Sequence, residues 1–351
     1  MRYAQVNSRY YCGIDLHSRT MYVCVMDKSG KILFQRNMQN DFKIFKESVK
    51  SFLPDMAVGV ESSCYYYWLS DACHAEGIPF YLGHALYMKA INGGKVKNDR
   101  VDSRKIADLL RANLFPLAYP YPKEMRATRD LLRRRHYYVR RRASTYSHLQ
   151  TLFIQHGKLD INLKQVKDKE NRGSLVKRFG NEDLQLMISA GLDYIEALDG
   201  IIADLEFQIR KQARNHDHNA YQLLMTTPGV GDILGLVILY ETHDVNRFAS
   251  VQCYSSYAGV VKCERSSAGK FLNTKNHKIR NPYLKWAFGE IILKAQASSP
   301  LIGKLYEQLQ SKYGLGRAKS IIAHRFAVAN YFMLKNKQPF DEKRFVQSSK
   351  Y

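Results

Sequence analysis

The stretch "KVKNDRVDSRK", residues 95–105, sets two aspartates three positions apart in a strongly basic segment. If a helix begins here, Asp99 and Asp102 lie on one side of its first turn. Carboxylates held close together repel one another unless a cation neutralises them. The pair therefore predicts a divalent-metal site. The structural alternative is an N-cap and a first-turn acid favoured by the helix dipole.

Two further acids come earlier in the chain, on predicted strands. Asp15 lies in "GIDLHS", within the first strand, and Glu61 ends the apolar run "MAVGVE". This order of acids is typical of an RNase H-like fold, where such carboxylates converge at one edge of a sheet. We expect the four acids to bind two Mg²⁺ ions, or Mn²⁺ in their place, because hard cations take oxygen ligands and polarise phosphodiesters. Singly, each acid could be an ordinary surface or capping residue.

The elements that would position these acids form a predicted α/β domain over residues 1–122. The run "YYCGIDLHSRTMYVCVMD" and the strand "KILFQRNMQ" flank "DKSG", a turn that suits a hairpin. Further strands are expected at "MAVGVES" and "IPFYLGH". Helices are expected at "DFKIFKESVKSFL", "YYYWLSDACHAEG" and "DSRKIADLLRANLF". Pro116 would end the last of these helices.

Residues 123–218 have a different composition and predict a basic helical arm. Apolar residues recur every seven positions in two segments, so either two antiparallel helices or a coiled coil that pairs chains would fit. The polar stretch between them, residues 157–180, is predicted to be a loop or insertion. The first seam is Met125, Leu132, Val139, Tyr146 and Phe153, and the second is Ile195, Ile202 and Ile209. Candidate nucleic-acid-binding residues on the first helix are Arg133, Arg134, Arg135, Arg140, Arg141 and Arg142.

Residues 219–351 predict a third, mainly helical region with two loops of interest. The turn "PGVG", with Gly229 and Gly231, precedes an apolar helix and could offer backbone N–H groups to a phosphate. The loop "RSSAGK", from Arg265 to Lys270, places serines in a basic segment, and an activated serine can attack a phosphodiester. Arg265 and Lys270 are further candidate nucleic-acid-binding residues. Such glycine-containing segments are more often ordinary turns and loops.

The charge of the whole chain predicts a polyanionic partner. With 54 basic and 32 acidic residues, the net charge is +22, which favours nucleic acid over a membrane surface. The sequence shows neither a membrane-spanning apolar run nor a signal-peptide pattern. Six scattered cysteines without a C-x-x-C pair argue against zinc or disulfide frameworks. We expect a cytoplasmic, nucleoid-associated prokaryotic protein.

Taken in order, the motifs resemble those of a known family. "GIDLHS", "GVESS", "NDRVDSRKIADLL", "TTPGVGDILG", "RFASVQCYSSYAGVV", "SSAGK" and "NPYLKWA" follow one another along the chain. This series resembles the DEDD transposases of the IS110 insertion sequences, which are bridge-RNA-guided recombinases, and their relatives the Moraxella-type DNA invertases. The resemblance extends over nearly the whole chain and is weakest at residues 157–180.

The resemblance implies a fold and a division of roles. It implies a RuvC-like catalytic domain at residues 1–122, a coiled-coil arm at 123–218 and a transposase domain at 219–351. Asp15, Glu61, Asp99 and Asp102 would hold the metal, and Ser267, with Ser266 as the alternative, would become covalently joined to DNA. It further implies donor and target DNA, an element-encoded bridge RNA, and a homodimer or homotetramer as partners.

Two other functions remain compatible with the residues. A metal-dependent junction-resolving nuclease would use water in place of serine and form no covalent protein–DNA adduct. A nucleic-acid-binding protein without catalysis would bind with steep salt dependence and would be indifferent to Mg²⁺.

Overall fold

The computed structural model describes residues 2–91, 98–213, 217–261, 266–267, 270–271 and 280–347. For residues 266–267 and 270–271 it describes the backbone alone. The chain divides into two compact units, Met1–Lys123 and Glu124–Tyr351.

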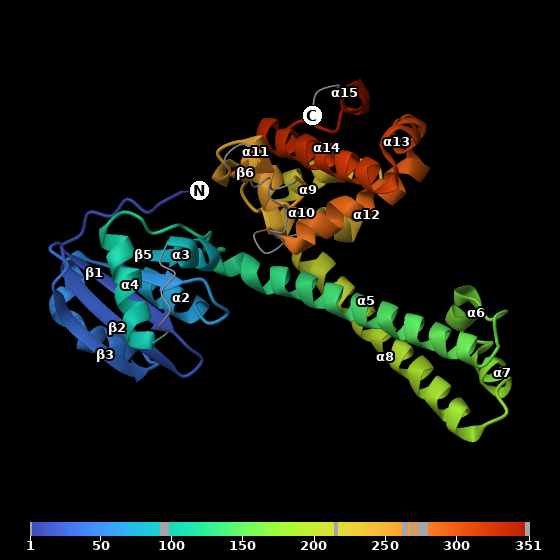
Figure 1. The fold of residues 1–351 in the computed structure, drawn as a ribbon, viewed down its shortest axis with the longest axis horizontal. Helices are drawn as coiled ribbons and strands as arrows, with labels where there is room; N and C mark the ends of the chain where they lie inside the picture. Colours follow the sequence, from blue (N-terminus) through green and yellow to red (C-terminus); the bar gives the residue numbers. More distant parts are fainter. Residues whose placement is uncertain are drawn as a thin grey trace. The chain divides into compact units, whose positions relative to one another are not determined.

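The first unit is built on a five-stranded mixed sheet with strand order β3-β2-β1-β4-β5 (Figure 1). β1, β2 and β3 form an antiparallel meander, whereas β4 runs parallel to β1 and β5 parallel to β4. The strands are β1 (Tyr10–Leu16), β2 (Thr20–Asp27), β3 (Ile32–Gln39), β4 (Met56–Glu61) and β5 (Phe80–Gly83). The carboxyl ends of β1 and β4, where two of the predicted acids stand, therefore lie at the same edge of the sheet.

The segment before "DKSG", residues 10–27, contains a turn that the sequence pattern did not predict. It folds into two strands, β1 and β2, joined by a tight turn in which the His17 N–H donates to the Thr20 carbonyl at 2.9 Å. Both strands are central and buried, so apolar residues continue on either side of the turn. The predicted hairpin between β2 and β3 is present, and Asp27 accepts from the Ser29 and Lys31 N–H groups at its turn.

Helices cover both faces of this sheet, because successive strand residues point to opposite sides. On one face, Ile14 packs in a cluster with Phe45 of α1 and Leu69 of α2. On the other, Tyr11 packs with Ile106 and Leu110 of α4. The helical elements are α1 (Phe42–Ser48), η1 (Lys50–Asp55), α2 (Tyr67–Ala75), α3 (Ala85–Ile91) and α4 (Asp99–Arg111).

The second unit begins with two long antiparallel helices, α5 (Lys123–Gln155) and α8 (Glu182–Ala213), which lie side by side (Figure 1). Arg135 on α5 pairs with Glu206 on α8 at 2.7 Å, and Arg142 pairs with Asp199 nearer the far end. Both predicted heptad seams contribute buried residues, among them Leu132 and Ile195. The antiparallel pair within one chain is thus present.

Residues 157–180 are not a simple loop, so that alternative of the prediction is wrong, whereas the insertion alternative stays a prediction. They contain α6 (Leu163–Lys167) and α7 (Arg172–Lys177). Ile161, Val166 and Phe179 are buried against the ends of α5 and α8. These apolar residues are sparse among lysines and polar residues, so the stretch carried too weak a periodicity to be recognised as helical.

The rest of the second unit is a helical bundle around one large core. Among the described residues, no helix is both long and apolar enough to cross a membrane. The elements are α9 (His218–Met225), α10 (Asp232–Thr242), η2 (Val245–Arg247), α11 (Val251–Tyr257), β6 (Ser266–Ser267), β7 (Lys270–Phe271), α12 (Pro282–Ser298), α13 (Pro300–Tyr313), α14 (Leu315–Asn336) and α15 (Glu342–Gln347).

Candidate metal centre and serine segment

Strand register places Asp15 and Glu61 next to each other. β1 and β4 are paired in parallel up to Ile14 and Val60, and the two acids are the residues that follow. Neighbouring strands lie about 4.8 Å apart, and residues at matching positions share one face of the sheet. Ile14 and Val60 both belong to the cluster on the α1 and α2 side, so the two acids are on the face that α4 covers.

Gly13 allows α4 to lie directly on β1. A Cβ atom at this position would come within 2.2 Å of the Ser103 carbonyl oxygen and 2.3 Å of the Ala107 nitrogen, both in the helix backbone. Only a residue without a side chain permits that approach. Gly13 precedes Asp15 by two residues, and Asp99 precedes Ser103 by one helical turn. The close packing therefore brings the start of α4 to the end of β1.

The first turn of α4 carries both acids of the "NDRVDSRK" motif. Asn98 is the N-cap, with its side chain accepting from the Arg100 N–H at 3.0 Å, so the helix begins at Asp99. Asp99 is about half exposed, whereas Asp102 is more covered and pairs with Lys105 at 3.4 Å. Neither acid is needed as the N-cap, because Asn98 has that role.

Three side chains offer metal-ligand atoms within 4.8 Å of one another: Asp15, His17 and Asp99. The Nε2 atom of His17 lies 3.3 Å from Asp15 Oδ2 and 3.5 Å from Asp99 Oδ2. Glu61 and Asp102 are outside this group of three in the part of the chain that the structure describes. The sequence patterns did not single out His17, although it stands in the "GIDLHS" motif.

The electrostatics of Asp15 suit a bound cation. Burial raises the pKa of its carboxyl group, and the negative charges of Asp99 and Asp102 raise it further, while His17 partly offsets both effects. Burial and repulsion from Asp99 and Asp102 both disfavour a negative charge at Asp15. A divalent ion bound at this place would offset both effects. The two carboxylates and one imidazole of this group, with Glu61 next to Asp15 by strand register, fit a divalent cation by their chemistry.

The predicted nucleophile lies in a short hairpin of the second unit. Ser266 and Ser267 form β6, which pairs antiparallel with β7 so that Ser267 is opposite Lys270. Arg265 lies outside the described residues. Tyr257 precedes this segment in the chain and Asn281 follows it. The Asn281 N–H donates to the Tyr257 carbonyl at 2.7 Å, so the chain before the segment lies next to the chain after it.

A buried carboxylate lies at that meeting place. Glu241 on α10 is 2% exposed and accepts from the Asn281 side chain at 2.8 Å. Two arginines of α5 also donate to it, Arg129 at 2.9 Å and Arg133 at 2.6 Å. The Asn281 amide donates in addition to the Tyr257 hydroxyl at 3.0 Å. No sequence motif indicated this network, because its members are far apart in the chain.

The six arginines predicted to bind nucleic acid fall into two groups. Arg133, Arg135 and Arg142 form ion pairs inside the second unit, with Glu241, Glu206 and Asp199. Arg134, Arg140 and Arg141 are exposed. The guanidinium groups of Arg134 and Arg141 lie over the ring of Tyr137, at 5.7 and 5.0 Å from its centroid. Nucleic-acid binding by any of the six stays a prediction.

The two glycines of the "PGVG" turn have different structural roles. Gly229 has φ +82°, and a Cβ atom there would meet the Ala295 nitrogen at 2.5 Å, so the turn packs tightly on α12. Gly231 is the N-cap of α10. The packing accounts for Gly229 without a ligand, and phosphate binding at this turn stays a prediction.

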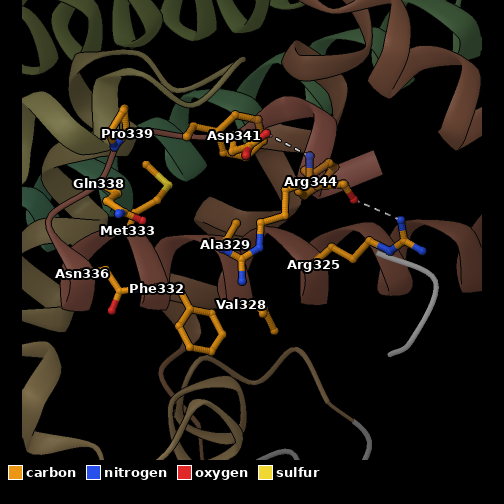
Figure 2. Close-up of a pocket in the computed structure, with 12 residues that line it drawn as sticks. Arg325, Val328, Ala329, Phe332, Met333, Asn336, Gln338, Pro339, Asp341 and Arg344 are labelled. Carbon is orange, nitrogen blue, oxygen red and sulfur yellow. Dashed lines mark hydrogen bonds between the residues drawn. The ribbon is translucent and has the colours of Figure 1, made fainter. Parts of the chain in front are cut away.

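A pocket between α14 and α15 lies apart from these residues in the sequence (Figure 2). Val328 and Phe332 line it together with Arg325 and Arg344. Arg325 donates to the Phe345 carbonyl at 3.3 Å, and Asp341 accepts from the Arg344 N–H at 2.9 Å. The Arg325 bond holds α15 against α14, whereas the Asp341 bond caps the start of α15, so Arg325 has a structural role here.

Comparison with known proteins gives matches in both units. The DEDD transposase model of IS110 matches residues 12–156, and the model of the transposase IS116/IS110/IS902 family matches residues 221–307. The candidate mini-circle transposase for IS117 of Streptomyces coelicolor is 29% identical over 133 residues. That match covers 36% of this chain and 31% of the relative, so the chain matches about a third of the relative's length.

The two family models together include the sheet, the acids, the first arm helix and the serine segment. The order of these elements agrees with the order of the motifs in the sequence. The chain belongs to the IS116/IS110/IS902 family of transposases.

Proposed function

We propose that this protein is a DNA transposase that cleaves and rejoins DNA, with a divalent-metal site at Asp15, Glu61, Asp99 and Asp102. The observation that carries the proposal is the arrangement of these acids at one sheet edge, where register aligns Asp15 with Glu61 and α4 supplies the other two. Family membership supports it. The strand order and the acids at the ends of β1 and β4 support a RuvC-like, RNase H-like domain at residues 1–122.

We propose Ser267 as the nucleophile of the reaction, with Ser266 as the alternative. Its hydroxyl oxygen would attack a phosphodiester phosphorus, the bond to one deoxyribose oxygen would break, and that oxygen would leave with a proton as a hydroxyl group. The phosphoserine ester conserves the bond energy needed for rejoining. A divalent ion bound by the four acids would polarise the phosphate, and Mg²⁺ or Mn²⁺ would serve.

The remaining proposals concern organisation and partners. Residues 123–218 would act as the arm and 219–351 as the transposase domain that carries the serine. The substrates would be donor and target DNA. An RNA encoded by the element would select the sites, two or four chains would assemble, and a coiled-coil pairing of the arms would join them. The exposed arginines of α5 would contact phosphates of these nucleic acids.

A covalent-trapping assay tests the proposal. Purified full-length protein is incubated with DNA carrying the element's ends, RNA transcribed from the same element and Mg²⁺, and is then resolved on a denaturing gel. We expect a protein–DNA adduct in the wild type and none with Ser267→Ala or Asp102→Asn. Ser266→Ala, which removes the neighbouring hydroxyl, is the matched control and should retain the adduct.

Other outcomes select among the alternatives. Cleaved DNA without an adduct, unchanged by Ser267→Ala, would support a nuclease that uses water. An adduct lost in Ser266→Ala and kept in Ser267→Ala would move the nucleophile by one residue. Binding without cleavage, with and without RNA, would contradict the enzymatic proposal.

A further inference from the structure

We propose that the imidazole of His17 is a direct ligand of the divalent ion held by Asp15 and Asp99. The site would then combine a nitrogen donor with carboxylate oxygens. This inference rests on the proposed metal centre and adds to it a residue that the four-acid pattern does not include.

The distances around His17 are close to those between ligands of a single ion. Its Nε2 atom is 3.3 Å from Asp15 Oδ2 and 3.5 Å from Asp99 Oδ2. Adjacent ligands of an octahedral ion with bonds of ~2.1 Å lie roughly 3 Å apart. All three ligand atoms lie within 4.8 Å of one another, so small side-chain movements would bring them to one ion.

The nitrogen is shared between the two carboxylates. Nε2 is covered from solvent, and its neighbours are the Asp15 and Asp99 oxygens at 3.3 and 3.5 Å. Neutral imidazole is a common metal ligand, and coordination would use the nitrogen's lone pair.

The backbone holds His17 in place independently of any ion. Its N–H donates to the Thr20 carbonyl at 2.9 Å, and its carbonyl accepts from the Asn40 side chain at 2.8 Å. Both bonds belong to the β1–β2 turn and the chain after β3. The ring is therefore presented to the end of β1 by the fold, as expected of a preorganised ligand.

A nitrogen ligand has a consequence for metal preference. Carboxylate oxygens suit hard ions such as Mg²⁺, whereas imidazole increases the relative affinity for Mn²⁺ and Co²⁺. The site should therefore bind Mn²⁺ more tightly than Mg²⁺, and removal of the ring should reduce that difference.

Pulsed electron paramagnetic resonance with Mn²⁺ alone tests the assignment on the purified full-length chain. We expect nitrogen hyperfine coupling from bound Mn²⁺ in the wild type. In His17→Asn the coupling should be lost, and the affinity for Mn²⁺ should fall roughly tenfold or more. The matched control is His74→Asn on α2, an exposed histidine of the same unit, which should change neither quantity. Asp15→Asn should abolish binding.

The outcomes separate this inference from the proposed function. Bound Mn²⁺ without nitrogen coupling in the wild type, or coupling that persists in His17→Asn, would overturn the ligand assignment while leaving the carboxylate site intact. Absence of Mn²⁺ binding by the wild type would contradict the metal centre itself. The wild-type measurement does not depend on the folding of any variant.

Discussion

Charged residues in this protein contribute unequally to the free energy of unfolding, and the size of each contribution depends on burial. Glu241 is almost fully buried. Burial raises its pKa, but the hydrogen bond from Arg133 and the charges of Arg129 and Arg133 outweigh burial, so the pKa lies below its ordinary value of 4.5. The charged form is thus favoured in the folded state. Its contribution to stability is present above pH 4.5 and is lost as the pH falls through the lower folded pKa.

We predict that Glu241→Gln lowers the free energy of unfolding at neutral pH by roughly 3–5 kcal/mol, because breaking a buried ion pair leaves the arginines uncompensated. The variant should also lose less stability than the wild type when the pH falls below 4.5. Urea unfolding at neutral and acidic pH measures both effects. Glu196→Gln is the control, since the Glu196 side chain is 55% exposed and its replacement should change the midpoint much less. Equal midpoints for wild type and Glu241→Gln would contradict the argument.

At the scale of elements, the proposed metal centre depends on how closely α4 approaches β1. That approach is possible because Gly13 has no side chain, and it brings Asp99 to Asp15. The helix itself is defined locally by the Asn98 cap and an apolar face that includes Ile106 and Leu110. Its position on the sheet is a property of the packed pair rather than of either element.

We predict that Gly13→Ala displaces α4, lowers stability by roughly 1–3 kcal/mol through overpacking and weakens Mn²⁺ binding. The added methyl group would meet helix backbone, which cannot rotate away as a side chain can. Thermal unfolding and Mn²⁺ titration measure the two effects. Gly200→Ala introduces the same group into α8, where nothing lies within 4 Å of the added atom, and should be neutral or stabilising. Unchanged Mn²⁺ affinity in Gly13→Ala would show that the helix position is not critical.

The net charge of +22 is a property of the whole molecule, but only part of it is available to a ligand. On α5, ion pairs inside the second unit occupy Arg133, Arg135 and Arg142. Arg134, Arg140 and Arg141 are exposed. Binding to phosphates releases counterions, so affinity for nucleic acid should fall steeply as salt is added.

We predict that replacing Arg134, Arg140 and Arg141 with Gln reduces the slope of log affinity against log salt by about 2–3, because each phosphate that an arginine neutralises adds roughly 0.9 to that slope. Fluorescence anisotropy with labelled duplex DNA over a salt series measures the slope. Replacement of Lys28, Lys31 and Lys43 with Gln removes the same charge from exposed positions of the first unit and should leave the slope nearly unchanged. Equal slopes in both triple variants would mean that total charge, not the α5 surface, governs binding.

Local features of the candidate site and the type of each region could be predicted from the order of the amino acids alone. Asp99 and Asp102 were predictable as neighbours on a helix, because positions three apart share a face and the apolar pattern after them is helical. The heptads predicted two long helices, and alternation predicted the strands. The family resemblance implied which serine of the loop would be the nucleophile, Ser267, and that assignment stays a prediction.

The tertiary structure alone decided which distant groups meet. The alignment of Asp15 with Glu61 depends on strand register, and the approach of His17 to Asp99 depends on α4 packing over Gly13. The pairing of Arg133 with Glu241 joins helices more than a hundred positions apart. Periodicity reports only the face on which a residue lies, whereas these contacts depend on long-range pairing and on packing without voids. For this reason the contacts of His17 and Glu241 could not be predicted from the sequence and are known only from the folded chain.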